Sequence, residues 1–138
     1  VCLVNNHLEP AHDAAVRAAI AGLAPAQASV ACPLTRRWAR TLSDEFKSGA
    51  CHAGRYETAI VMALAPALVD EASRSALPAV PISLSEQLRA GVTTFAAMGM
   101  DRAYAGAPAE ATAAEGEGSL DRLAQMIATE VLEALARS

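Results

Sequence analysis

The sequence predicts an α/β fold: a layered fold with a mainly parallel sheet and flanking helices. Two observations predict it. Residues 1–5 and 28–32 are short apolar runs without polar alternation, which is typical of strands buried in a parallel sheet. Each run is followed by a segment of helical or irregular pattern, and a strand–helix–strand–helix order implies right-handed crossovers between parallel strands.

The elements of the first third follow directly. After the strand at residues 1–5, Pro10 suits the first position of a helix, because that position needs no N–H donor. Apolar residues then recur at helical spacing until Pro25, which ends the predicted helix. Residues 28–32 form the second predicted strand, and a polar segment over 34–47 is expected to be a helix or two short turns.

The remaining elements are one short helix, one irregular stretch and one long helix. Residues 56–64 carry apolar side chains on one helical face, so we predict a helix there. Prolines and glycines punctuate 70–118, which indicates long loops with short helices. Residues 119–136 show the clearest apolar stripe, and Ser119 is the expected N-cap of that final helix.

Composition excludes several classes of protein. The net charge of −4 leaves no basic patch for nucleic acid, and no apolar run reaches the roughly 18 residues of a membrane span. Cys2, Cys32 and Cys51 lack a C-x-x-C spacing, which favours reduced thiols in a cytoplasmic protein. The chain opens on a strand without a Met, so we expect residues 1–138 to be the C-terminal part of a single domain whose N-terminal half is missing from this chain.

The first candidate site follows the first strand. Ligands of open parallel sheets bind beyond the carboxyl ends of the strands, where His7 and Glu9 stand. Residues two apart in extended backbone face the same side, and an imidazole beside a carboxylate can ligate Zn²⁺ or Mn²⁺. Two ligands are too few for a complete site. The alternative is that Asn6 and His7 bond to backbone at the strand end and that Glu9 caps the helix starting at Pro10.

The second candidate site is the loop before the predicted helix at 56–64. An Ala-Gly pair follows His52, so backbone can approach a ligand closely. A histidine ahead of a helix N-terminus can stay neutral and act as a base or proton shuttle. Glu57 falls on the apolar face of the helix, where a lone carboxylate is costly to bury. The alternatives are a loop histidine bonded to a carbonyl and a glutamate that supports a local cap.

These segments resemble motifs of the creatininase family of amidohydrolases. Residues 5–10, Asn-Asn-His-Leu-Glu-Pro, resemble the family's Asn-Gly-His-x-x-Asn segment, which in creatininase itself has a Glu two residues after the His. Residues 52–59, His-Ala-Gly-Arg-Tyr-Glu-Thr-Ala, resemble the family's His-(Ala/Gly)-Gly-x-x-Glu-Thr-Ser segment. A later Gly-x-Pro pattern over 106–116 also matches, so the resemblance covers nearly the whole chain in order.

The resemblance implies a metal-dependent enzyme. His7 and Glu9 match metal ligands, His52 matches the catalytic histidine, and Glu57 matches a site-supporting acid. Two divalent ions, Zn or Mn, would activate a water that hydrolyses the carbon–nitrogen bond of a small-molecule substrate, a cyclic amide or formamide. The family's other ligands come from an N-terminal motif that this chain lacks. A homo-oligomer, a hexamer in this family, is also implied.

The sequence departs from the family pattern at several positions. Asn6 replaces Gly, Pro10 replaces Asn and Ala59 replaces Ser, while the small, open loop at 47–51 disfavours creatinine itself as substrate. These departures keep a second hypothesis open, in which the protein is a catalytically inactive binding or oligomer-forming module of the same family.

Overall fold

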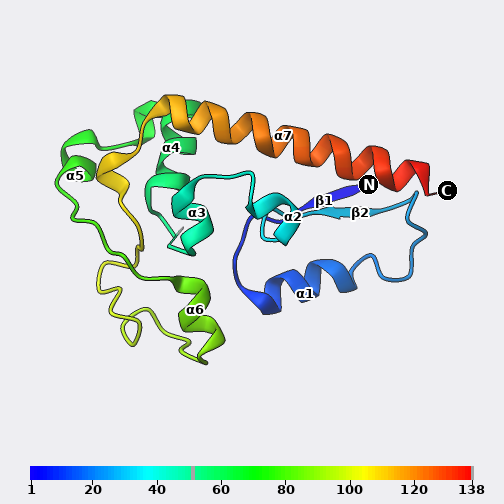
Figure 1. The fold of residues 1–138 in the computed structure, drawn as a ribbon, viewed down its shortest axis with the longest axis horizontal. Helices are drawn as coiled ribbons and strands as arrows, with labels where there is room; N and C mark the ends of the chain where they lie inside the picture. The colour runs from blue at the N-terminus through cyan, green and yellow to red at the C-terminus, as the bar shows by residue number, and fades with distance from the viewer. Residues whose placement is uncertain (51, 138) are drawn as a thin grey trace. The chain divides into compact units, whose positions relative to one another are not determined.

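The computed structural model describes residues 1–50 and 52–137, so Cys51 lies outside the described residues. The fold mixes helices with a small parallel sheet of two strands, which confirms the α/β class in its coarse form (Figure 1). The chain divides into two compact units. The first consists of Val1–Thr41 with Asp121–Ser138, and the second consists of Leu42–Leu120.

The first unit holds both strands. Its elements are β1 (Cys2–Val4), α1 (Pro10–Ala18), β2 (Ser29–Ala31), α2 (Arg36–Ala39) and the C-terminal part of α7 (Ala113–Ala136). The strands pair in parallel, with Cys2 opposite Ser29 and Val4 opposite Ala31. In Figure 1 they run between α1 and the C-terminal part of α7.

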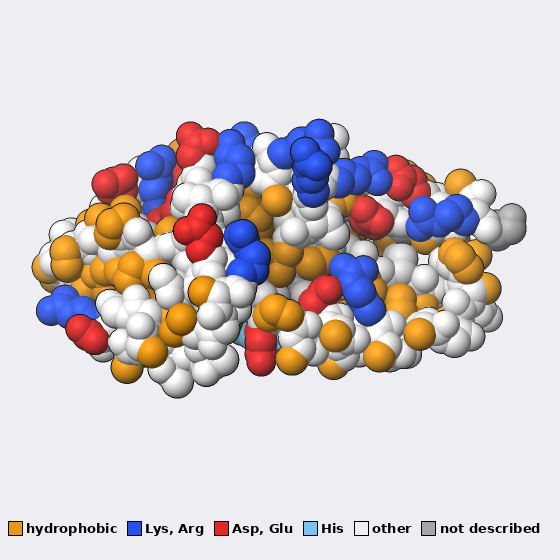
Figure 2. Space-filling model, turned by 60° about the horizontal axis from the view of Figure 1, so that its bottom comes forward, with side chains coloured by type: hydrophobic (Ala, Val, Ile, Leu, Met, Phe, Trp, Pro, Cys, Tyr) orange, Lys and Arg blue, Asp and Glu red, His pale blue; other side chains and the backbone are white. Residues whose placement is uncertain are grey.

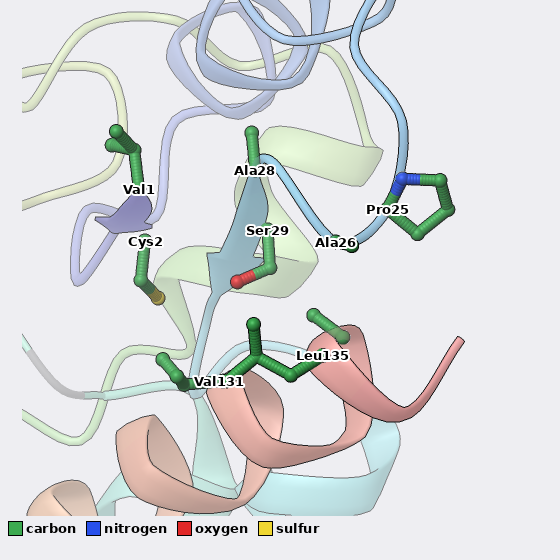
Figure 3. A pocket seen from close by; sticks show the side chains of 9 residues that line it. Val1, Cys2, Pro25, Ala26, Ala28, Ser29, Val131 and Leu135 are labelled. Atoms are coloured by element: carbon green, nitrogen blue, oxygen red, sulfur yellow. The ribbon is translucent and has the colours of Figure 1, made fainter. Parts of the chain in front are cut away.

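One face of the sheet packs against α7. Figure 3 shows the side chains of Cys2 and Ser29 pointing from the strands toward Val131 and Leu135 of the helix, around a cavity of about 90 Å³. Ala31 is fully buried. Burial of apolar side chains at this face is what orders two strands that would be unstable alone.

Helix α1 begins at Pro10 as predicted but ends at Ala18, well before Pro25. Residues 19–23 form turns instead. No residue of α1 is fully buried among those the structure describes, so the predicted apolar stripe gains little from packing. An ion pair between Arg17 and Asp13, with Nε–Oδ2 at 2.8 Å, supports the helix from its surface.

The second unit is helical. Its elements are α3 (Asp44–Ser48), α4 (Arg55–Leu64), the 3₁₀ turn η1 (Pro66–Leu68), α5 (Glu71–Ser75), α6 (Leu84–Arg89), the 3₁₀ turn η2 (Pro108–Glu110) and the first turns of α7. The short helices of residues 70–118 match the prediction. Antiparallel bridges join His52 to Ala105 and Val80 to Gly106.

The apolar face predicted for the helix at 56–64 is not the buried face of α4. Tyr56 and Ala59 are buried, whereas Val61 and Leu64 are 40% and 67% exposed. The reason is close packing: a Cβ on Gly116 would collide with the carbonyl oxygen of Ala59. Small residues therefore face the neighbouring helix, which the apolar stripe alone does not reveal.

Helix α7 begins six residues before the predicted start. Thr112 caps it, since its Oγ1 accepts a hydrogen bond from the backbone N–H of Glu115 at 3.2 Å. This Thr-x-x-Glu spacing is that of a capping box. Ser119, the predicted cap, lies inside the helix and is 1% exposed. Gly116, within the stretch predicted to be irregular, lies in the helix and packs closely against Ala59.

Hydrophobic side chains remain on the surface of both units. Figure 2 shows them spread among charged ones over one face of the molecule. The most exposed large ones are Val1, Leu64, Leu68 and Leu132. Within residues 1–50 and 52–137, no helix combines the length and the apolar character that crossing a membrane requires.

Candidate functional site

The loop between β1 and α1 carries His7 and Glu9. The His7 Nε2 and Glu9 Oε2 atoms are 3.7 Å apart, and both side chains are more than half exposed. Glu9 occupies the N-cap position of α1, yet its side chain makes no capping hydrogen bond. Its carboxylate faces the imidazole rather than the helix, so the capping alternative does not describe it. An imidazole and a carboxylate at this spacing suit a shared divalent ion.

Asn5 holds this loop in place. Its side chain is 1% exposed. The Oδ1 atom accepts a hydrogen bond from the His7 backbone N–H at 2.9 Å, and Nδ2 donates to Asp13 Oδ1 at 3.1 Å. The backbone N–H of Asn5 donates to Ala31 at 2.9 Å. The residue thus ties the strand end, the loop and the first turn of α1 together.

The charged groups near Asn5 are Asp13 and Arg17 of α1, which form an ion pair. The hydrogen bond from Arg17 lowers the pKa of the Asp13 carboxyl, with a smaller contribution from Asn5. Burial raises the pKa of the neighbouring Cys32 thiol. Asp13 therefore stays ionised as the acceptor for Asn5, while Cys32 stays a neutral thiol.

His12, to which the sequence assigns no role, contacts His7. The two ring centroids are 5.1 Å apart and the rings meet edge to face. No group of three potential metal-binding side chains is assembled within the described residues. His7 and Glu9 thus fit a metal chemically as part of a ligand set, and further donors are needed to complete it.

His52 lies on a tightly held loop in the second unit. Its carbonyl oxygen accepts a hydrogen bond from the Ala105 N–H at 2.8 Å. Its ring packs at 44° on Phe95, with centroids 4.8 Å apart. Ala53, the next residue, has a φ of 47°, an uncommon conformation for a residue with a side chain. An aromatic wall and a fixed backbone suit a histidine that must present its imidazole in one direction.

A hydrogen bond to Glu57 holds Ala53 in this conformation. The Glu57 Oε2 atom accepts a hydrogen bond from the Ala53 backbone N–H at 2.7 Å. Glu57 sits in the first turn of α4, where the helix dipole favours a negative charge. It is half-buried rather than buried on an apolar face, so it acts on the residue after His52.

A groove of about 410 Å³ adjoins Glu57 in the second unit. Thr58 and Asp70 give it polar edges, and Val61 and Leu68 give it an apolar wall. A groove of this size accommodates a small molecule. The Asp70 carboxylate is already engaged, because it accepts hydrogen bonds from the backbone N–H and the hydroxyl of Ser73.

Glu45 was missed by the sequence reasoning. Its carboxylate accepts hydrogen bonds from the backbone N–H groups of Arg55, Tyr56 and Ala107, at 2.9, 2.6 and 2.7 Å. No local pattern marks it, because its partners lie 10, 11 and 62 residues away in the sequence. Asn5, by contrast, had a visible signal as a polar residue ending an apolar strand.

The predicted site residues fall into two groups. His7 and Glu9 belong to the first unit and contact each other. His52 and Glu57 belong to the second, where Glu57 bonds to the residue after His52. Each group combines an imidazole with a carboxylate. Hydrolases use such side chains as metal ligands and to transfer protons.

The chain is thus an α/β protein with one histidine–glutamate pair after a parallel strand and another at the start of a helix. The family model for creatininase, described as creatinine amidohydrolase, matches residues 1–131. The chain belongs to the creatininase family, which connects it with metal-dependent amidohydrolase activity. Neither the curated proteins nor the solved structures contain a significant match to it.

Proposed function

We propose that the protein hydrolyses a carbon–nitrogen bond of a small cyclic amide or formamide with metal-activated water. Family membership over residues 1–131 carries the proposal, and the facing His7 and Glu9 side chains support it. On this proposal the two units belong to one creatininase-like domain with a mainly parallel, layered core. Bound divalent ions would polarise the carbonyl and lower the pKa of water toward neutrality.

The chain's own residues have distinct tasks in this proposal. The imidazole of His7 and the carboxylate of Glu9 would hold metal at the end of β1, together with ligands from elsewhere in the protein. His52 moves a proton to or from the tetrahedral centre, and Phe95 shields one side of its ring. Glu57 fixes the Ala53 N–H and thereby the direction in which His52 points.

The experiment is an assay of the intact protein on cyclic amides and formamides with added Zn²⁺ or Mn²⁺. His52→Ala is expected to lower kcat by about 10²–10⁴-fold, the usual contribution of a general acid–base. Added imidazole should restore part of the loss, because it replaces the missing proton carrier. Full activity in His52→Ala would refute the assigned role.

A second candidate is a creatininase-like module without catalysis, which binds or assembles. Two observations favour it. The side chains of His7 and Glu9 are 57% and 60% exposed to solvent, and the sequence departs from the family pattern at Asn6 and Pro10. The two candidates differ in metal uptake. A protein that binds no divalent ion but forms a stable homo-oligomer would support the second.

A further inference from the structure

A single carboxylate ties together three backbone groups of the second unit. Glu45 lies in the first turn of α3. Its Oε1 accepts hydrogen bonds from the N–H groups of Arg55 and Ala107, and its Oε2 accepts one from Tyr56. The distances of 2.6–2.9 Å are those of charge-assisted hydrogen bonds.

Two of these donors belong to the first turn of α4. Arg55 and Tyr56 open the helix, and their N–H groups have no acceptor within it. Gly54 stands at the N-cap without a side chain to accept them. Glu45, which lies on a different helix, accepts these N–H groups and so caps α4. Its negative charge lies at the positive end of the α4 dipole.

The third donor fixes the segment that pairs with His52. Ala107 follows Gly106 directly, and Ala105 donates its N–H to the His52 carbonyl oxygen. A Cβ on Gly106 would collide with the Glu45 carboxylate and with the carbonyl of Ala50. The segment around 105–107 is therefore held against Glu45 by a hydrogen bond and by close packing.

His52 lies between the two segments that this carboxylate binds. On one side the chain continues through Gly54 into α4, and on the other Ala105 pairs with His52. A Cβ on Gly54 would meet both Glu45 and the Ala105 carbonyl, so all three segments are in contact. Glu45 therefore forms hydrogen bonds with both of the segments that support the His52 backbone.

We propose that Glu45 is a positioning residue for His52, which holds the imidazole in the orientation needed for proton transfer. The proposal rests on the proton-transfer role of His52 given above. Glu45 itself has no direct part in the chemistry, because its carboxylate is occupied by backbone donors. Geometric errors of about 1 Å at a catalytic group can cost on the order of 10²-fold in rate.

The test compares Glu45→Gln with Glu86→Gln in the intact protein. Glutamine keeps the length of the side chain but loses its charge and one acceptor oxygen. Glu86 is an exposed acid of the first turn of α6 and serves as the matched control. We expect Glu45→Gln to lower kcat at least about 10-fold with little change in KM and in bound metal, while Glu86→Gln matches the wild type.

The second readout is the NMR signal of the His52 imidazole. Glu45→Gln should shift its ring resonances and alter its contact with Phe95, and should speed hydrogen exchange at Arg55 and Tyr56. Wild-type kcat together with unchanged His52 resonances would overturn the proposal. If Glu45→Gln does not fold, Glu45→Asp replaces it, since that change keeps the charge and withdraws the carboxylate by one methylene.

Failure of the proposed function is distinguishable from failure of the positioning role. If the intact protein hydrolyses none of the substrates but Glu45→Gln still shifts the His52 resonances, Glu45 positions the His52 ring and the proton-transfer role of His52 is what fails. If the protein is active and Glu45→Gln behaves like Glu86→Gln in both readouts, the positioning role is wrong and the hydrolase stands.

Discussion

At the scale of residues, the end of β1 depends on one ionised aspartate. Asp13 accepts hydrogen bonds from Asn5 and from Arg17, and the Arg17 bond lowers its pKa. Asn5 in turn accepts the N–H of His7. The orientation of the candidate metal ligand is therefore coupled to the charge of Asp13.

This coupling predicts a pH dependence. A carboxyl whose pKa falls on folding stabilises the folded state above its unfolded pKa of about 3.9, and that contribution is lost as pH falls through the lower folded pKa. Asp13→Asn should lower Tm by up to about 4 °C at pH 7. The difference from the wild type should shrink between about pH 5 and pH 2.

Calorimetry over this pH range measures the effect. Asp101→Asn, at an exposed aspartate of the second unit, is the control. Its Tm difference from the wild type should not shrink as the pH falls from about 5 to 2. A difference for Asp13→Asn that stays constant down to pH 2 would show that Asp13 does not contribute through its charge.

Single residues were predictable where the signal was local. Pro10 marks the first residue of α1, which the structure confirms. The position after a parallel strand makes His7 and Glu9 candidate ligands, and the structure places their side chains 3.7 Å apart. Glu45 was not predictable, because it acts on backbone groups far along the chain. Its partners are backbone N–H groups, which almost every residue has, so the identities of the partner residues give no sign of the contact.

At the scale of elements, close packing between α4 and α7 determines which face of α4 is buried, and the apolar pattern does not reveal that face. Val61 and Leu64 belong to the apolar face of α4 that the sequence pattern predicts, but they lie on the surface. Ala59 and Gly116 make the close contact instead. Small residues carry almost no hydrophobic signal, so a contact built from them is hidden from periodicity.

Gly116→Ala tests this contact. In an exposed helix, Gly to Ala stabilises by up to about 1 kcal/mol. Here the new methyl group would collide with the Ala59 carbonyl oxygen, so we expect a net destabilisation of about 1–3 kcal/mol. Denaturant unfolding measures the change.

Gly22→Ala is the matched control for this experiment, because a Cβ there meets nothing within 4 Å. It should change the free energy of unfolding by less than about 0.5 kcal/mol. A stabilised Gly116→Ala protein would show that the two helices do not approach closely at this point.

At the scale of the whole molecule, the coarse fold class and the family were accessible from the sequence. The alternation of apolar runs with helical segments indicated an α/β protein, and the ordered motifs indicated creatininase. The division into two units was not predictable, because one continuous helix contributes to both: its residues 121–136 belong with the strands, while its first turns belong with α4.

Metal binding at His7 and Glu9 is measured by the metal content of the intact protein, determined by elemental analysis after purification without chelators. We expect about two divalent ions per chain, with Glu9→Gln losing or weakening at least one while remaining folded. Glu117→Gln, at an exposed acid of α7, should keep both. An intact protein that holds no divalent ion and takes up none on titration would contradict the account.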